Sequence, residues 1–80
     1  MNDYDLEHVY NDQIAPLMAQ IVAICWQYGM PLLVSCAYAH DEAKDATRYY
    51  TTLVEINYRP LPEFRRAQAV IRQVEEGELP

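Results

Sequence analysis

Two cysteines and two histidines are the residues of this sequence best suited to nucleophilic or metal chemistry. Cys36 and His40 share one side of a predicted strand, but four strand residues place them about 13 Å apart, too far for a thiol to meet its base. A zinc site needs close ligand pairs, and Cys25, Cys36, His8 and His40 provide none at the usual spacing. We therefore expect buried free thiols, no catalytic residues, and no metal or other cofactor.

Acidic residues outnumber basic residues by twelve to six, which gives a formal net charge of −6. Asp41, Glu42 and Asp45 fall in a polar segment, where no apolar surroundings would shift a carboxyl pKa toward acid–base catalysis. An acidic balance opposes nucleic-acid binding and favours solubility or docking on a basic protein surface. An alternative function as a nucleic-acid-binding regulator would use three arginines of the predicted C-terminal helix, namely Arg65, Arg66 and Arg72.

Seven tyrosines in 80 residues are more than one small core can enclose. Tyrosine combines a large contact area with a small loss of side-chain entropy, and this combination favours protein interfaces. In the alternative interpretation, the rings cover the margins of the core and leave their hydroxyls in water. We expect a protein-interaction surface that includes Tyr4, Tyr10, Tyr38, Tyr49 and Tyr50.

A helix that gives way to a strand positions many of these residues. Apolar residues recur at three- and four-residue steps as far as Tyr28, after which Gly29 can take the left-handed conformation that ends a helix. Pro31 prevents the helix from resuming, and a period of two over residues 32–39 predicts a strand. Pro16 conflicts with an uninterrupted first helix, so the helix either begins shortly before Pro16 or kinks there. We expect a short leading turn and then a main helix.

The second half of the chain predicts another strand and another helix. Segment 40–47 is polar without an apolar period, which indicates an exposed hairpin loop. Residues 49–58 alternate and are rich in Tyr, Thr, Val and Ile, as is typical of an antiparallel strand. Pro62 suits the first position of a helix, and Gly77 is expected to end it. The sequence thus predicts an α+β fold in the order helix, strand, strand, helix, as one domain over residues 1–80.

A two-stranded hairpin packed on two helices is a small unit with exposed strand edges. A chain of this length buries only about 60–65% of its unfolded surface, and a lone hairpin is marginal in water. We expect a homodimer that joins edge strands or packs apolar surfaces, with a monomer whose helices shield the edges as the alternative. Both helices are expected on one face of the sheet, the face of Val54, Ile56 and Tyr58. The helix residues expected there are Leu17, Ile21, Cys25, Phe64, Val70, Ile71 and Val74.

The sequence also bears on location. No apolar run approaches the roughly 20 residues that are needed to cross a bilayer. The acidic start Met1–Asp5 does not have the form of a signal peptide. We therefore expect a soluble, cytoplasmic protein.

The junction Ile24–Ser35 resembles a pattern found in small uncharacterised phage and prophage accessory proteins. In these proteins a helix that ends in Cys and Gly runs into a strand led by Pro, after an acidic start and a Pro inside the first helix. The resemblance covers about half of the chain and stops after Tyr49. It implies a non-enzymatic, phage-derived protein that binds and inhibits or modulates a host protein, of the anti-CRISPR or another anti-defence type. An enzyme or small-ligand pocket between the helices and the sheet is the least favoured alternative.

Overall fold

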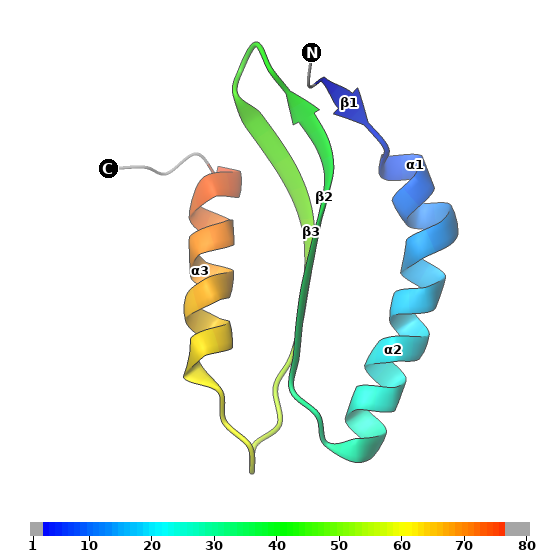
Figure 1. Ribbon diagram of the computed structural model, residues 1–80, viewed down its shortest axis with the longest axis vertical. Coiled ribbons are helices and arrows are strands. Elements are labelled where there is room, and N and C mark those ends of the chain that lie inside the picture. Colours follow the sequence, from blue (N-terminus) through cyan, green and yellow to red (C-terminus); the bar gives the residue numbers. More distant parts are fainter. Residues whose placement is uncertain (1–2, 77–80) are drawn as a thin grey trace.

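The computed structural model describes residues 3–76, without the side chains of 74–76, and contains helices and a three-stranded antiparallel sheet (Figure 1). The elements are β1 (Tyr4–Asp5), α1 (Glu7–Val9), the π-helical turn η1 (Tyr10–Ile14), α2 (Ala15–Tyr28), β2 (Leu32–Asp41), β3 (Ala46–Val54) and α3 (Pro62–Glu76). The predicted α+β class is confirmed. The predicted order is incomplete, because the short strand β1 precedes the first helix. The helix end predicted at Gly77 lies outside the described residues.

The sheet has the order β1–β2–β3, and β2 and β3 form a long hairpin. The predicted loop over 40–47 is wrong at both ends, because the pairing continues to Asp41↔Ala46 and leaves a turn of only four residues. Asp41 Oδ1 accepts hydrogen bonds from the backbone N–H groups of the turn, and Asp45 takes a left-handed φ of 49°. The predicted second strand over 49–58 lies too far along the chain, since β3 begins at Ala46 and ends at Val54.

The two helices cover opposite faces of the hairpin, α2 on one side and α3 on the other (Figure 1). Leu32 and Val54 are register partners and pack with Cys25 of α2. Leu53, on the other face, lines a groove together with Phe64 of α3. The expectation that both helices share one face is therefore wrong. The hairpin carries apolar side chains on both faces, and one helix per face is the arrangement that covers both.

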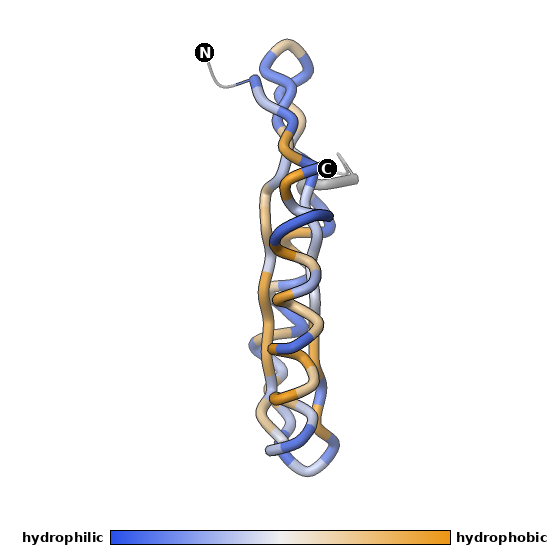
Figure 2. The backbone as a smooth tube through the Cα atoms, turned by 90° about the vertical axis from the view of Figure 1, so that its right-hand side faces the viewer, coloured by the Kyte–Doolittle hydropathy of each residue, from blue (hydrophilic) through white to orange (hydrophobic). Residues whose placement is uncertain are grey.

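The core is small because the molecule is a slab of 43 × 34 × 15 Å, narrow in the side view of Figure 2. Its buried apolar residues are Cys25, Ala39, Val54 and Ile56. Phe64 and Ile71 are half-buried, as a contact with the sheet requires. Four residues predicted for the core are instead exposed, and Val74 lies outside the side chains described. The exposed four are Leu17 (57%), Ile21 (43%), Tyr58 (72%) and Val70 (60%).

A π turn allows the first helical segment to continue past Pro16. Pro16 has no N–H to donate, and it lies in the first turn of α2. The preceding Ala15 N–H reaches back five residues to the carbonyl of Tyr10, which is the hydrogen bond of a π turn. The observed helix therefore combines the two sequence alternatives: a regular helix begins next to Pro16, and helical backbone also precedes it. None of the described helices is long and apolar enough to span a membrane.

The other end of α2 stops at Gly29, as predicted from the sequence. Gly29 has a φ of 66°, and the N–H of Met30 bonds to the carbonyl of Cys25 at 2.9 Å. The Arg59 guanidinium donates to the carbonyls of Gly29 and Tyr28 at 2.7 and 3.3 Å, where a positive charge complements the helix dipole. This contact fastens the segment after β3 to the end of α2.

Candidate functional site

Two segments that are far apart in sequence meet at one end of the slab, where β1 lies beside the hairpin turn (Figure 1). Tyr4 pairs with His40, and the side chain of Asp3 accepts a hydrogen bond from the N–H of Glu42. Lys44 and Arg48 are the basic residues of these two segments. We call this region the acidic end; its carboxylates are Asp3, Asp5, Glu7, Asp41, Glu42 and Asp45.

Three tyrosines stack next to the acidic end. The Tyr50 ring lies 4.4 Å from the ring of Tyr10 and 4.5 Å from that of Tyr38, measured between centroids. The Tyr50 hydroxyl donates to Glu7 at 2.7 Å, and this hydrogen bond raises the pKa of Tyr50 to about 12. We call Tyr10, Tyr38 and Tyr50 the tyrosine stack; it holds the first helical segment against the sheet.

Arg48 links the tyrosine stack to the acidic end. Its guanidinium lies 5.5 Å from the centroid of the Tyr38 ring and forms an ion pair with Asp5 at 3.2 Å. Both charged side chains are more than half exposed, so the pair adds little to stability. It does position one guanidinium and one carboxylate at fixed places beside the aromatic rings.

The five tyrosines predicted for one contact surface divide into separate places. Tyr10, Tyr38 and Tyr50 form the half-buried stack, and the partly exposed Tyr4 donates its hydroxyl to the carbonyl of Ala37 at 2.9 Å. Tyr49 points to the other face of the sheet, toward α3. The structure therefore brings three of the five tyrosines together, and their role in a protein-interaction surface stays a prediction. The most exposed aromatic side chains of the described residues lie outside the predicted surface, namely Trp26, Tyr28 and Tyr58.

The three arginines of α3 do not form a row of unpaired cations. Arg65 holds Glu55 through two hydrogen bonds of 2.6 and 3.1 Å, which raise the pKa of Arg65 and lower the pKa of Glu55. Arg72 borders a shallow hollow next to Tyr49, and Arg66 lies on the outer side of α3 by helical spacing. Nucleic-acid binding through this helix stays a prediction. The pairing with Glu55 makes it less favourable, because Arg65 would have to leave this carboxylate to bind a phosphate.

An open groove of about 390 Å³ lies between β3 and the start of α3. Apolar side chains such as Leu53 and Phe64 line it, and the Arg65–Glu55 pair lies at its margin. Its volume falls within the range of small-ligand sites, about 300–1,000 Å³. Its charged side chains are already engaged, however: Arg65 and Glu55 bind each other, and Arg59 donates to the carbonyls that end α2.

Neither cysteine forms a disulfide. Cys25 and Cys36 are free thiols, with Cys25 buried in the core and Cys36 half-buried. Nδ1 of His40 shares a 2.7 Å hydrogen bond with the hydroxyl of Thr47. Within residues 3–76, no three His, Cys, Asp or Glu side chains form a group that could hold a metal ion.

Comparisons of the chain with protein-family models, with curated proteins and with solved structures found no match. The fold and the side chains therefore carry the functional argument. Two surface features are suited to binding a partner: the acidic end with its tyrosine stack, and the exposed apolar side chains of α2.

Proposed function

We propose that this protein is a small, non-enzymatic binding protein that docks its acidic end on a basic surface of a host protein and inhibits or modulates that protein. The observation that carries the proposal is the meeting of six carboxylates, from the chain start and the hairpin, at one end of the slab. Opposite charges across an interface speed association and select the partner. The tyrosine stack beside them supplies rigid aromatic area for the contact.

The class of partner follows from charge and from the phage resemblance. Proteins that bind nucleic acid present Lys- and Arg-rich surfaces, and an acidic protein can occupy such a surface in place of phosphates. A phage accessory protein of the anti-CRISPR or another anti-defence type would direct this contact at an effector in the host cytoplasm. The net charge of −6 suits such a partner and opposes direct binding to DNA or RNA.

Neutralisation of the acidic end provides the test. In the double variant Asp41→Asn, Asp45→Asn, the amide oxygen at 41 still accepts the turn hydrogen bonds, and Asn tolerates the left-handed backbone at 45. The matched control is Asp12→Asn, Glu63→Gln, which removes two exposed carboxylates elsewhere. Both variants change the net charge by the same amount, so only the position of the lost charges differs.

Two measurements separate the outcomes. We expect the wild type and the control to restore phage plaquing on a CRISPR-immune host and to retain the effector on an affinity column, while the acidic-end variant does neither. Equal behaviour of the two variants would overturn the role of the acidic end. Titration with DNA and RNA at low salt tests the alternative function: tight, salt-sensitive binding that weakens in Arg65→Ala would favour a nucleic-acid-binding regulator.

A further inference from the structure

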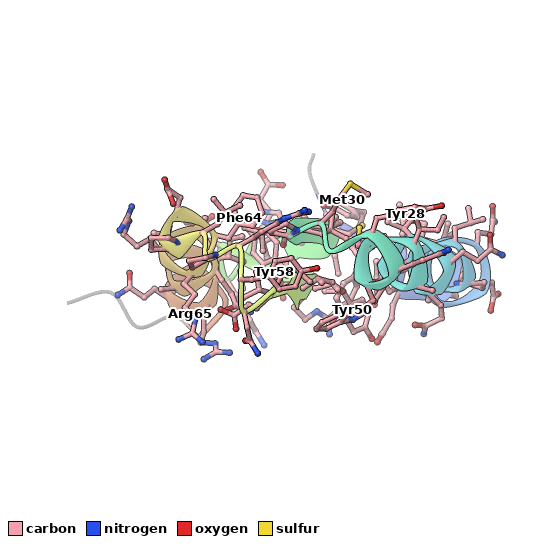
Figure 3. The ribbon with its side chains drawn as sticks, turned by 90° about the horizontal axis from the view of Figure 1, so that it is seen from below. Tyr28, Met30, Tyr50, Tyr58, Phe64 and Arg65 are labelled. Atoms are coloured by element: carbon pink, nitrogen blue, oxygen red, sulfur yellow. The ribbon has the colours of Figure 1, made fainter. Side chains whose placement is uncertain are left out.

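One broad side of the slab carries a continuous apolar stripe along α2. Steps of four, three and four residues place the stripe on one side of the helix, as in a coiled-coil seam. Figure 3 shows Tyr28 and Met30 on this broad side and Arg65 and Tyr50 on the opposite one. We call it the apolar side; the stripe consists of Leu17, Ile21, Ile24 and Tyr28, each between 43% and 62% exposed.

The outer edge of β2 lies on the same side and is covered only at one end. β1 pairs with Ala39 and His40, and the Tyr4 hydroxyl donates a hydrogen bond to the carbonyl of Ala37. Within residues 3–76, no strand pairs with the outer edge of β2 over 32–36. Proteins usually protect such edges with charges or proline, yet residues 13–39 contain no Asp, Glu, Lys or Arg. An uncharged edge of this kind is suited to pairing with another strand.

The surface area of the chain indicates how much of it a partner should cover. The accessible surface is 6000 Å², against about 5,000 Å² expected for a compact 9.3 kDa monomer. The radius of gyration is 14.4 Å, against about 11.6 Å for a compact domain of this length. The surplus of about 1,000 Å² is close to the roughly 800 Å² that each partner buries in a standard stable interface.

We propose that a second copy of this chain covers the apolar side, in a twofold-symmetric dimer whose two β2 strands pair antiparallel about an axis at Val34. The two hairpins then join into one four-stranded sheet. With the axis at Val34, Ala37 lies opposite Pro31 of the second copy. The carbonyl of Ala37 already accepts a hydrogen bond from the Tyr4 hydroxyl, and Pro31 has no N–H that could donate to it. The strand pairing can therefore end at these two residues in both copies without leaving an N–H group of Pro31 unbonded.

The helices fit the same symmetry. A twofold axis normal to the sheet does not exchange the two faces of the sheet. The two α2 helices therefore lie on the same face of the joined sheet, next to each other. Two neighbouring hairpins are two strand spacings apart, about 9.6 Å, and helices pack at 8–10 Å. α2 and β2 are antiparallel and are joined by the turn at Gly29. Because a strand rises about 3.3 Å per residue and a helix 1.5 Å, Val34 lies roughly level with the part of α2 between Ile21 and Ile24, which is the middle of the stripe. The stripe therefore packs on its own copy.

Charge explains why the partner is a second copy. The core of a stable interface is poor in charged residues, and the uncharged stretch 13–39 provides such a core twice in a symmetric dimer. A chain with a net charge of −6 can self-associate here without bringing like charges together at the centre. On α3, Ala67 and Val70 lie on the side away from Arg65 by helical spacing and face their counterparts on the other face of the sheet.

The mass of the full chain in solution provides the first test. We expect light scattering after gel filtration to give twice 9.3 kDa for the wild type at micromolar concentration. Ile24→Glu places a charge in the stripe and should halve the mass or abolish folding, whereas the control Ala19→Glu places the same charge on the opposite side of α2 and should leave a dimer. A wild type of 9.3 kDa, or equal masses for the two variants, would overturn the proposal.

Cross-linking tests the geometry without the risk of unfolding. Ile21→Cys lies close to the axis and should form a covalent dimer with a short thiol cross-linker, while Ala19→Cys and the wild type should not. Failure of Ile21→Cys to cross-link, or equal cross-linking of Ala19→Cys, would overturn this arrangement. So would a monomer that forms a one-to-one complex with a host protein through the stripe. A dimer that restores no plaquing would leave this inference standing and overturn the proposed function.

Discussion

Val54→Ala tests the core of the fold directly. Val54 is 2% exposed and packs with Cys25 of α2 and Ile56, so its side chain connects the hairpin to the first helix. The change removes two buried carbon groups at about 0.8 kcal/mol each, and the cavity adds a further share, for a total of about 2–3 kcal/mol. A domain of 80 residues has a free energy of unfolding of about 4–12 kcal/mol, so this one substitution removes a substantial part of it.

Urea unfolding followed by circular dichroism measures this loss at a fixed protein concentration. Lys44→Ala, in the exposed turn, serves as the control and should change the free energy of unfolding by less than about 0.5 kcal/mol. Ile21→Ala gives a further comparison. With 43% of Ile21 exposed, the change should cost about 1.4 kcal/mol in a monomer, and more as dimers form at higher concentration. A midpoint for Val54→Ala equal to that of Lys44→Ala would refute the packing of α2 on this face.

Three further predictions concern local contacts. Arg59→Lys weakens the bonds to the carbonyls that end α2 and should lower the free energy of unfolding by about 1 kcal/mol, seen as a fall of about 4–8 °C in the melting midpoint. Gly29→Ala should cost about 1–2 kcal/mol for its left-handed backbone, and the exposed Tyr58 side chain should move aside to make room for the added methyl group. Adding Tyr58→Phe should therefore recover little of this loss, which unfolding of the four forms measures. The hydrogen bond of Tyr50 to Glu7 should contribute fully below pH 10 and be lost as the pH rises through about 12. Ultraviolet titration of the wild type against Tyr50→Phe should therefore differ by one tyrosine that ionises near pH 12, and a difference near pH 10 would contradict this contact.

Local signals in the sequence predicted the boundaries that depend on few residues. Gly29 ends α2 because its backbone adopts the left-handed conformation that other residues avoid. Pro62 begins α3 because its fixed φ suits a first helical position. The hairpin follows from alternation in β2 and β3. The bulge between Ala37 and Ala39 carried no comparable signal.

Features that depend on distant partners could not be predicted in this way. The strand β1 has two residues and exists because Tyr4 pairs with His40, far along the chain. The acidic end likewise arises only when the chain start reaches the hairpin turn. Helix α2 is apolar on more than one side, so periodicity alone did not separate the side that meets the sheet at Cys25 from the exposed side at Ile24.

The acidic end lies beyond the Ala39–His40 end of β2, away from Val34. In the proposed antiparallel dimer, the two acidic ends therefore point in opposite directions from the axis. One dimer offers two docking points to a partner that carries two basic patches or that is itself a dimer. After the first contact, the second becomes intramolecular, and a pair of weak contacts is converted into avid binding. Avidity of this kind would let an 80-residue chain hold a much larger protein without a large interface at either point.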